Sequence, residues 1–159
     1  MYPVLKAFHI LAVVVFLGTI LLGIFWKRIA DRTASARIIA HTIGGIIQAD
    51  RIFTMPSIVI IVAAGVGMGF ISGVPFLGTG WLLWGIVLFI IAGLAFIPLA
   101  RVQLQLHEIA LGGLSSQAER EQYQALSHRW NLWGSIALIT PLFAFFLMVV
   151  KPALPVLHH

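Results

Sequence analysis

Cysteine is absent from the 159 residues, which excludes disulfides, thiolate nucleophiles, thiolate metal sites and iron–sulfur clusters. Charged residues are also scarce, at 9% of the chain, whereas soluble domains carry roughly 25%. Hydrophobic residues make up 60%, which is more apolar surface than a soluble fold of this length can bury. We therefore expect an integral membrane protein with the bilayer as its solvent.

Acidic residues are the rarer of the charged types, with five Asp and Glu against ten Lys and Arg. An excess of basic residues can indicate nucleic-acid binding. Here the basic residues lie at the ends of the apolar segments, where membrane topology alone accounts for them. We therefore expect no nucleic-acid partner.

Four segments are long and apolar enough to cross a bilayer, which takes about 20 residues. They cover residues 4–26, 52–71, 81–99 and 132–150. Only helices satisfy every backbone polar group within one spanning segment, so the fold class predicted is an all-α, four-helix membrane bundle in a single domain covering 1–159.

Two of the predicted helices continue beyond the membrane. Isoleucines at helical spacing in 34–50 predict that the second helix begins near residue 34. The third is expected to run to about residue 110, where Gly112 and Gly113 stop it. Ser115 or Ser116 then caps a short acidic helix that contains Glu119 and Glu121.

The basic residues also predict the orientation. Eight fall on one side of the predicted spans and two, Lys6 and Lys151, on the other. The eight are Lys27, Arg28, Arg32, Arg37, Arg51, Arg101, Arg120 and Arg129. Positive residues accumulate on the cytoplasmic side, so both termini should face away from the cytoplasm.

His9 is the candidate cofactor ligand of the outer half, because an ionisable residue within a span is costly and is a functional hypothesis by default. Its imidazole suits an axial haem bond, a metal or a proton relay. Met68 or Met148 could lie opposite. Gly65 and Gly69 begin a stripe that would admit a flat ligand. Helix–helix packing is the alternative for the stripe and for both methionines.

A second candidate site lies at the cytoplasmic mouth of the bundle. Polar residues at the inner helix ends would meet there and bind an anionic head group or a carboxylate: Lys27, Asp50, Arg51, Arg129 and Asn131. The alternative is a belt of ordinary surface ion pairs. Asp50 requires a partner so close to the membrane, and Lys27, Arg51 or Arg129 could supply it.

Three histidines, His41, His107 and His128, also fall on the cytoplasmic side. No pair has the i, i+3 or i, i+4 spacing of a helical metal site, so no metal is predicted and their clustering is left open. His158 and His159 end the sequence like a tag remnant and are set aside.

Five sequence blocks stand out along the chain: KAFHI (6–10), FWKRIADRT (25–33), DRIFTMP (50–56), GTGWLLWG (78–85) and HRWNLWGSIALITPL (128–142). Together they resemble a bacterial family of small predicted integral membrane proteins of unknown function. This resemblance covers nearly the whole chain and implies a fold class without an activity.

The opening KAFHILAVVVFLG (6–18) also resembles, more distantly, the HemJ-type protoporphyrinogen oxidases and their CopD-like relatives. That resemblance implies a four-helix membrane protein with haem at the first-helix histidine, which His9 matches. The third helix of that family opens G-W-L-H-x-K, where this chain has Leu83 and Gly85 at the histidine and lysine positions. The oxidase activity is therefore not carried over.

Together these features favour a protein of the bacterial inner membrane that binds haem b or has a redox-associated role. The alternatives are a non-enzymatic protein or accessory subunit that binds lipid or a small molecule, and a copper- or metal-handling protein. Enzymatic activity is left open. The expected partners are the lipid bilayer and a homo-oligomer or larger membrane complex.

Overall fold

The computed structural model describes residues 1–156 and contains four helical rods long and apolar enough to cross a membrane. The first is α1 (Tyr2–Arg32). The second joins α2 (Ala36–Ala49), the short π-helix η1 (Asp50–Thr54) and α3 (Met55–Ser72). The third is α4 (Gly80–Leu111) and the fourth is α5 (Gln117–Val150). The predicted all-α class with four spanning helices is confirmed. His158 and His159 lie outside the described residues.

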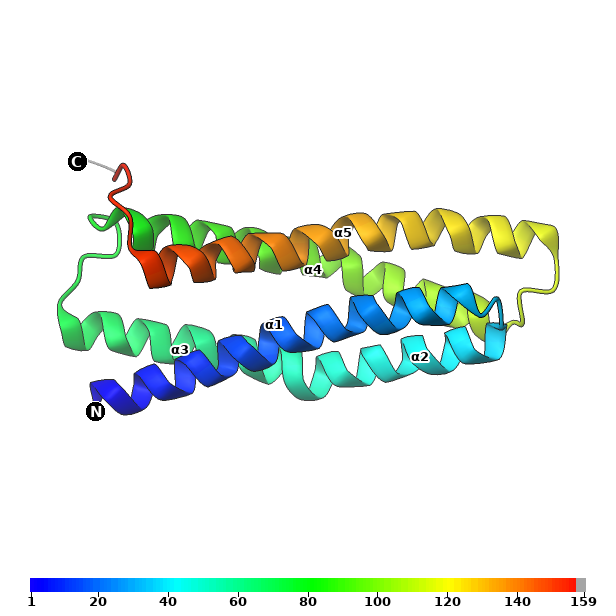
Figure 1. Cartoon of the computed structure of the whole chain (residues 1–159), viewed down its shortest axis with the longest axis horizontal. Helices are drawn as coiled ribbons and strands as arrows, with labels where there is room; N and C mark the ends of the chain where they lie inside the picture. Colours follow the sequence, from blue (N-terminus) through cyan, green and yellow to red (C-terminus); the bar gives the residue numbers. More distant parts are fainter. Residues whose placement is uncertain (157–159) are drawn as a thin grey trace.

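The rods run side by side, and the N-terminus and the C-terminal segment lie at the same end (Figure 1). An even number of spans requires this arrangement. The α1–α2 turn and the α4–α5 connection lie together at the opposite end. Which end faces the cytoplasm rests on the eight basic residues, and that orientation stays a prediction.

Most of the expected helix extensions are present. The second rod begins at Ala36, and α4 continues to Leu111 before the turn at Gly112 and Gly113. The separate short acidic helix was wrong, because Gln117–Val150 forms one helix of 34 residues. Polar residues of 117–131 continue the helix into the apolar span, since no Gly or Pro interrupts them.

Ser116 begins α5 with a complete capping box. Its side chain accepts a hydrogen bond from the backbone N–H of Glu119, and the Glu119 carboxylate accepts one from the Ser116 N–H. This exchange satisfies two backbone donors that the first turn would leave unpaired. It fixes where the long helix starts, and so where the residues of its first turns point.

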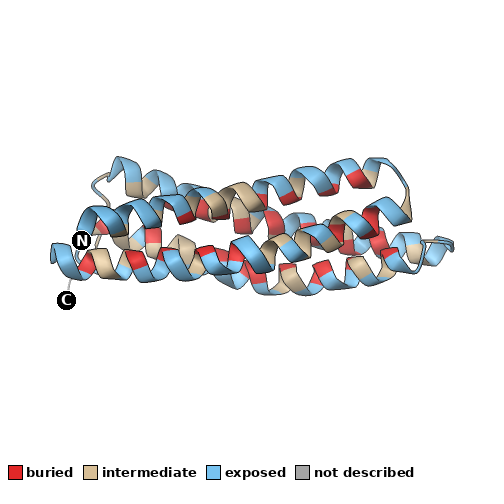
Figure 2. Ribbon diagram, turned by 90° about the horizontal axis from the view of Figure 1, so that it is seen from below, coloured by how far each residue is buried: buried red, intermediate tan, exposed pale blue. Residues whose placement is uncertain are grey.

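Buried residues follow the inward faces of the rods and exposed residues cover the outside (Figure 2). The larger core cluster lies towards the α1–α2 turn and includes Ala30, Ile43, Leu106 and Trp130. A smaller cluster in the other half contains Ala12, Phe16, Ile20 and Ile61. The difference in size between the two clusters fits a membrane protein. Burial of apolar side chains drives packing in water but not among lipid tails, so the half within the lipid needs a smaller core.

The helices associate in pairs. The most extensive packing joins α4 to α5, while α1 packs against α3 and then against α2. Within residues 1–156, α3 makes no backbone approach to α4 or α5. The two pairs are therefore held together chiefly at the end that contains the larger core.

Candidate functional site

Lys27 is a charged residue inside the bundle, with a relative exposure of only 1%. Its Nζ atom donates to Asp31 Oδ2 at 2.7 Å and to Ser127 Oγ at 2.7 Å. Nζ also lies 5.5 Å from the centre of the Tyr123 ring and 5.1 Å from that of Trp130. A buried ammonium needs an opposite charge and hydrogen-bond partners, and aromatic faces stabilise it further. This lysine therefore does not extend to the surface, as a basic residue of the lipid-facing belt would.

Asp31, one turn further along α1, links that helix to α5. Its Oδ2 accepts from Lys27, and its Oδ1 accepts from the Tyr123 hydroxyl at 2.6 Å. Tyr123 and Ser127 are four residues apart on α5, so both face the end of α1. With Trp130, these two residues make three α5 side chains next to the Lys27–Asp31 ion pair of α1.

Asp50 has two neutral partners instead of the cation that the sequence suggested. Its Oδ1 accepts from the Thr54 hydroxyl at 2.9 Å, and its Oδ2 accepts from Gln103 Nε2 at 2.9 Å. The expected pairing with Lys27, Arg51 or Arg129 was wrong. Lys27 is bonded to Asp31, while Arg51 and Arg129 are exposed.

The π-helix η1 explains how Asp50 and Thr54 point inward together. Pro56 follows it and has no backbone N–H to donate to the carbonyl four residues earlier. A wider π turn absorbs that lost hydrogen bond, and such turns are frequent at functional sites. Thr54, at 0% relative exposure, then lies beside the carboxylate.

Trp130 connects the side chains around Lys27 to those around Asp50. One face of its ring lies near Lys27 Nζ, and its Nε1 donates to Gln103 Oε1 at 2.9 Å. Gln103 thereby receives from Trp130 and donates to Asp50. In the described part of the chain every buried side-chain nitrogen and oxygen has a partner. We call these eight residues the inner network: Lys27, Asp31, Asp50, Thr54, Gln103, Tyr123, Ser127 and Trp130.

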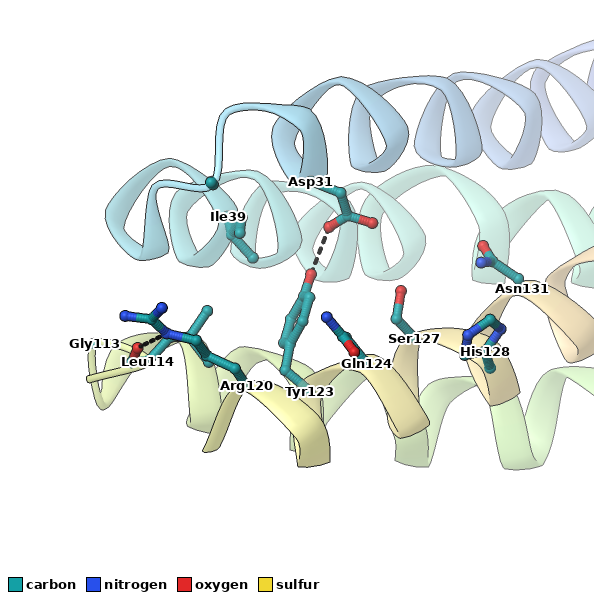
Figure 3. Close-up of a pocket in the computed structure, with 11 residues that line it drawn as sticks. Asp31, Ile39, Gly113, Leu114, Arg120, Tyr123, Gln124, Ser127, His128 and Asn131 are labelled. Atoms are coloured by element: carbon teal, nitrogen blue, oxygen red, sulfur yellow. Dashed lines mark hydrogen bonds between the residues drawn. The ribbon is translucent and has the colours of Figure 1, made fainter. Parts of the chain in front are cut away.

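Beside the inner network lies a hollow of about 480 Å³, bounded by the α1–α2 turn, the α4–α5 connection and the first turns of α5. Asp31, Tyr123 and Ser127 of the network belong to its wall, and so does the predicted site residue Asn131. In Figure 3, Arg120 lies at one end near Gly113 and Leu114, and His128 and Asn131 lie at the other. The hollow therefore combines hydrogen-bonding side chains with a rigid backing.

His9 and the glycine stripe lie in the other half of the molecule. His9 Nδ1 is 2.9 Å from the carbonyl oxygen of Ile61, and a Cβ placed on Gly65 would lie 3.4 Å from the His9 ring. The Phe76 ring covers Gly69. The stripe thus receives side chains of its own chain, while the haem role of His9, Gly65 and Gly69 stays a prediction.

The two methionines are placed differently. Met148 rests its methyl group against Gly85, one of the positions where the chain departs from the HemJ-type pattern. Met68 is partly buried in α3. Packing accounts for Met148, and the ligand role of Met68 stays a prediction.

The three histidines that the sequence assigned to the cytoplasmic side do not gather. His107 packs against Gly44, His128 belongs to the wall of the hollow, and His41 is exposed. Among residues 1–156, no group of three His, Asp or Glu side chains could hold a metal ion.

Four membrane-length helices with a polar network at one end define this chain as an integral membrane protein of the four-helix type. More particularly, it belongs to the family described as "Predicted integral membrane protein (DUF2269)", whose model matches residues 3–152. No curated protein and no solved structure matches the chain. The resemblance to HemJ-type oxidases therefore rests on the sequence pattern alone.

Proposed function

We propose that this protein is a non-enzymatic binding protein of the bacterial inner membrane, which takes a small molecule or a lipid head group into the hollow at its cytoplasmic end. The observation that carries the proposal is a hollow of about 480 Å³ whose polar wall is backed by the inner network. Ligand pockets commonly enclose roughly 300–1,000 Å³ and contain a few well-placed polar groups.

The inner network supports the proposal because a binding site needs side chains whose positions are already fixed. Asp31, Tyr123 and Ser127 each form a hydrogen bond within the inner network. Their positions are therefore determined before any ligand arrives, which reduces the entropy lost on binding. Gln124, His128 and Asn131 belong to the same wall and are exposed, so they are accessible to a ligand.

The pairing of Lys27 with Ser127 bears on whether the hollow is catalytic. A serine–lysine pair can act as nucleophile and base only when the amine is neutral. Here Nζ donates to Asp31 Oδ2 at 2.7 Å as well as to Ser127 Oγ, so the lysine and the serine belong to an ion-pair network instead of an isolated pair. This geometry supports binding rather than hydrolysis.

Filling the hollow tests the proposal. Gln124 is exposed, belongs to the wall and lies outside the inner network, so Gln124→Trp should block the hollow without disturbing the fold. We expect polar lipid extract, or a panel of small phosphates and carboxylates, to raise the thermal midpoint of the wild type in nanodiscs. The same additions should leave Gln124→Trp unchanged.

Gln48→Trp is the matched control, because Gln48 is exposed on α2 and does not border this hollow. It should respond like the wild type. An unresponsive wild type, or equal responses from the wild type and Gln124→Trp, would contradict binding in the hollow.

A haem group bound by His9 is the second candidate function. The observation that favours it is the contact between His9 Nδ1 and the Ile61 carbonyl. Histidine ligands usually donate one ring nitrogen to a carbonyl, which leaves the other free to bind the metal. The fit is partial, because Phe76 covers Gly69 and would have to move for a porphyrin to lie flat on the stripe.

An absorption spectrum tests the haem candidate directly. Haem bound through His9 should give the purified protein a Soret band that is absent from His9→Ala. His107→Ala serves as the control, because His107 lies against Gly44 in the other half of the molecule. A colourless protein after expression with added haem would end this candidate and would not affect the proposal for the hollow.

A further inference from the structure

We infer that the ligand of the hollow is a small water-soluble anion, a phosphate or a carboxylate, and that Arg120 is the residue that holds it. This inference rests on the proposed function, since it concerns the same hollow. It adds the charge of the ligand, the side from which it enters and the residue that anchors it.

Arg120 contributes a cation to the wall without a carboxylate partner. Its Nε donates to the carbonyl oxygen of Leu114 at 2.9 Å, which fixes the guanidinium and leaves its two Nη groups as donors. Across residues 1–156 the one ion pair is Lys27–Asp31. A guanidinium held in this way can donate two parallel hydrogen bonds to a phosphate or carboxylate.

The acidic neighbours of Arg120 have other partners. Glu119 accepts from the Ser116 backbone in the capping box, and Glu121 accepts from Gln117 Nε2 at 2.9 Å. Neither carboxylate belongs to the wall of the hollow. A cation in the first turns of a helix is also unfavourable next to the helix dipole. Arg120 thus stands where helix stability alone would not favour it.

The backbone before α5 orients this arginine. Leu114, whose carbonyl accepts from Arg120, has a φ of 51°, and Gly113 before it has a φ of 96°. A non-glycine residue in the left-handed region is uncommon and is often found where function requires it. The turn directs the Leu114 carbonyl to the guanidinium at one end of the hollow (Figure 3).

The net charge of the hollow favours an anion. Asp31 is its one carboxylate, and Lys27 neutralises that charge from behind the wall. Arg120 remains as an uncompensated positive charge. Gln124 and Asn131 supply neutral amide groups to the remainder of the ligand. A ligand with one anionic end and a polar body fits this distribution.

The position of Arg120 distinguishes a soluble anion from a lipid head group. Asn131 comes directly before the apolar run 132–150, so it marks the membrane boundary of α5. Arg120 is eleven residues earlier, about 16 Å further out at 1.5 Å per residue. The head-group layer adds only about 5–8 Å to each side of the hydrocarbon core. A lipid phosphate in that layer would lie near His128 and Asn131 instead.

Phosphate titration of the protein in phosphatidylcholine nanodiscs tests this inference. Inorganic phosphate should raise the thermal midpoint of the wild type in a saturable way. In Arg120→Gln we expect the half-saturating concentration to rise about tenfold or more, as loss of a charge-assisted, bidentate contact implies. Arg120→Lys keeps the charge but cannot donate two parallel hydrogen bonds, so its half-saturating concentration should lie between those of the wild type and Arg120→Gln. Arg101→Gln is the control, because Arg101 is exposed on α4 and borders no part of the hollow.

Each other outcome overturns a specific part of the inference. If Arg120→Gln titrates like the wild type, Arg120 is not the anchor. If phosphatidylglycerol nanodiscs stabilise the wild type through His128 and Asn131, and phosphate does not, the anion comes from the lipid. A wild type that responds to the small-molecule panel through Gln124 but not to phosphate or carboxylates would overturn the inference and preserve the proposed function.

Discussion

Lys27→Ala should lower the free energy of unfolding by about 3 kcal/mol, because it breaks a buried ion pair from one side. Loss of one partner of such a pair costs roughly 3–5 kcal/mol when the remaining charge stays buried. Asp31 retains 31% exposure and its bond from Tyr123, so the lower end of that range applies. Reversible unfolding in mixed micelles of dodecylmaltoside and SDS measures the change.

Two control variants separate the causes of that loss. Lys27→Met preserves most of the side-chain volume, so it should lose less stability than Lys27→Ala, and the difference measures the cavity. Arg28→Ala removes an exposed charge from the next position and should change stability by less than about 0.5 kcal/mol. Equal, small effects of Lys27→Ala and Arg28→Ala would show that the lysine lies at the surface.

The fold was largely predictable because its strongest determinants are local. Apolar runs of membrane length indicated the four spans, and the isoleucine spacing indicated the extension before Asp50. Gly112 and Gly113 marked the end of α4, and Ser115 or Ser116 marked the start of the next helix, which Ser116 caps. The prediction of a separate short helix failed because polarity was read as a boundary, although nothing in 117–131 stops a helix.

The site was much less predictable because its contacts join distant parts of the sequence. Asp50 and Gln103 are 53 residues apart, Asp31 and Tyr123 are 92 apart, and Lys27 and Ser127 are 100 apart. Which side of a helix faces its neighbours is poorly marked when lipid-facing and core-facing residues are both apolar. The composition therefore indicated which end of the bundle is polar, but not which of its side chains bond to each other.

Trp130 and Gln103 show why burial within the network was hard to predict from the sequence. A tryptophan at the predicted membrane boundary is ordinary, since aromatic residues collect at both interfaces. Trp130 is nevertheless 3% exposed and donates its N–H inside the bundle. Gln103 and Gln105 lie in the same VQLQL run of α4, but only Gln103 is buried and requires an internal partner. The sequence alone does not distinguish the two amides, so it did not mark Gln103 as a member of a buried network.

The inner network compensates for an asymmetry in the packing. Within residues 1–156, α3 has no close backbone approach to α4 or α5, so in the half that holds the termini the two helix pairs meet mainly through side chains such as Phe16 and Phe89. At the inner end, Gln103 of α4 joins Asp50 of η1, and Asp31 of α1 joins Tyr123 of α5. These hydrogen bonds connect the second rod to the third and the first to the fourth. The hollow, with its wall formed partly by α1 and α5, depends on them for its shape.

Gln103→Leu should destabilise the protein by about 2–4 kcal/mol, because it leaves two buried polar groups without partners at roughly 1–3 kcal/mol each. Those groups are Asp50 Oδ2 and Trp130 Nε1. Leucine has nearly the volume of glutamine, so the loss does not come from a cavity, and Gln105→Leu is the exposed control. The double variant Gln103→Leu with Trp130→Phe removes one unpaired group. It should therefore lose less stability than the sum of the two single variants, whereas additive losses would show that Gln103 and Trp130 are not coupled.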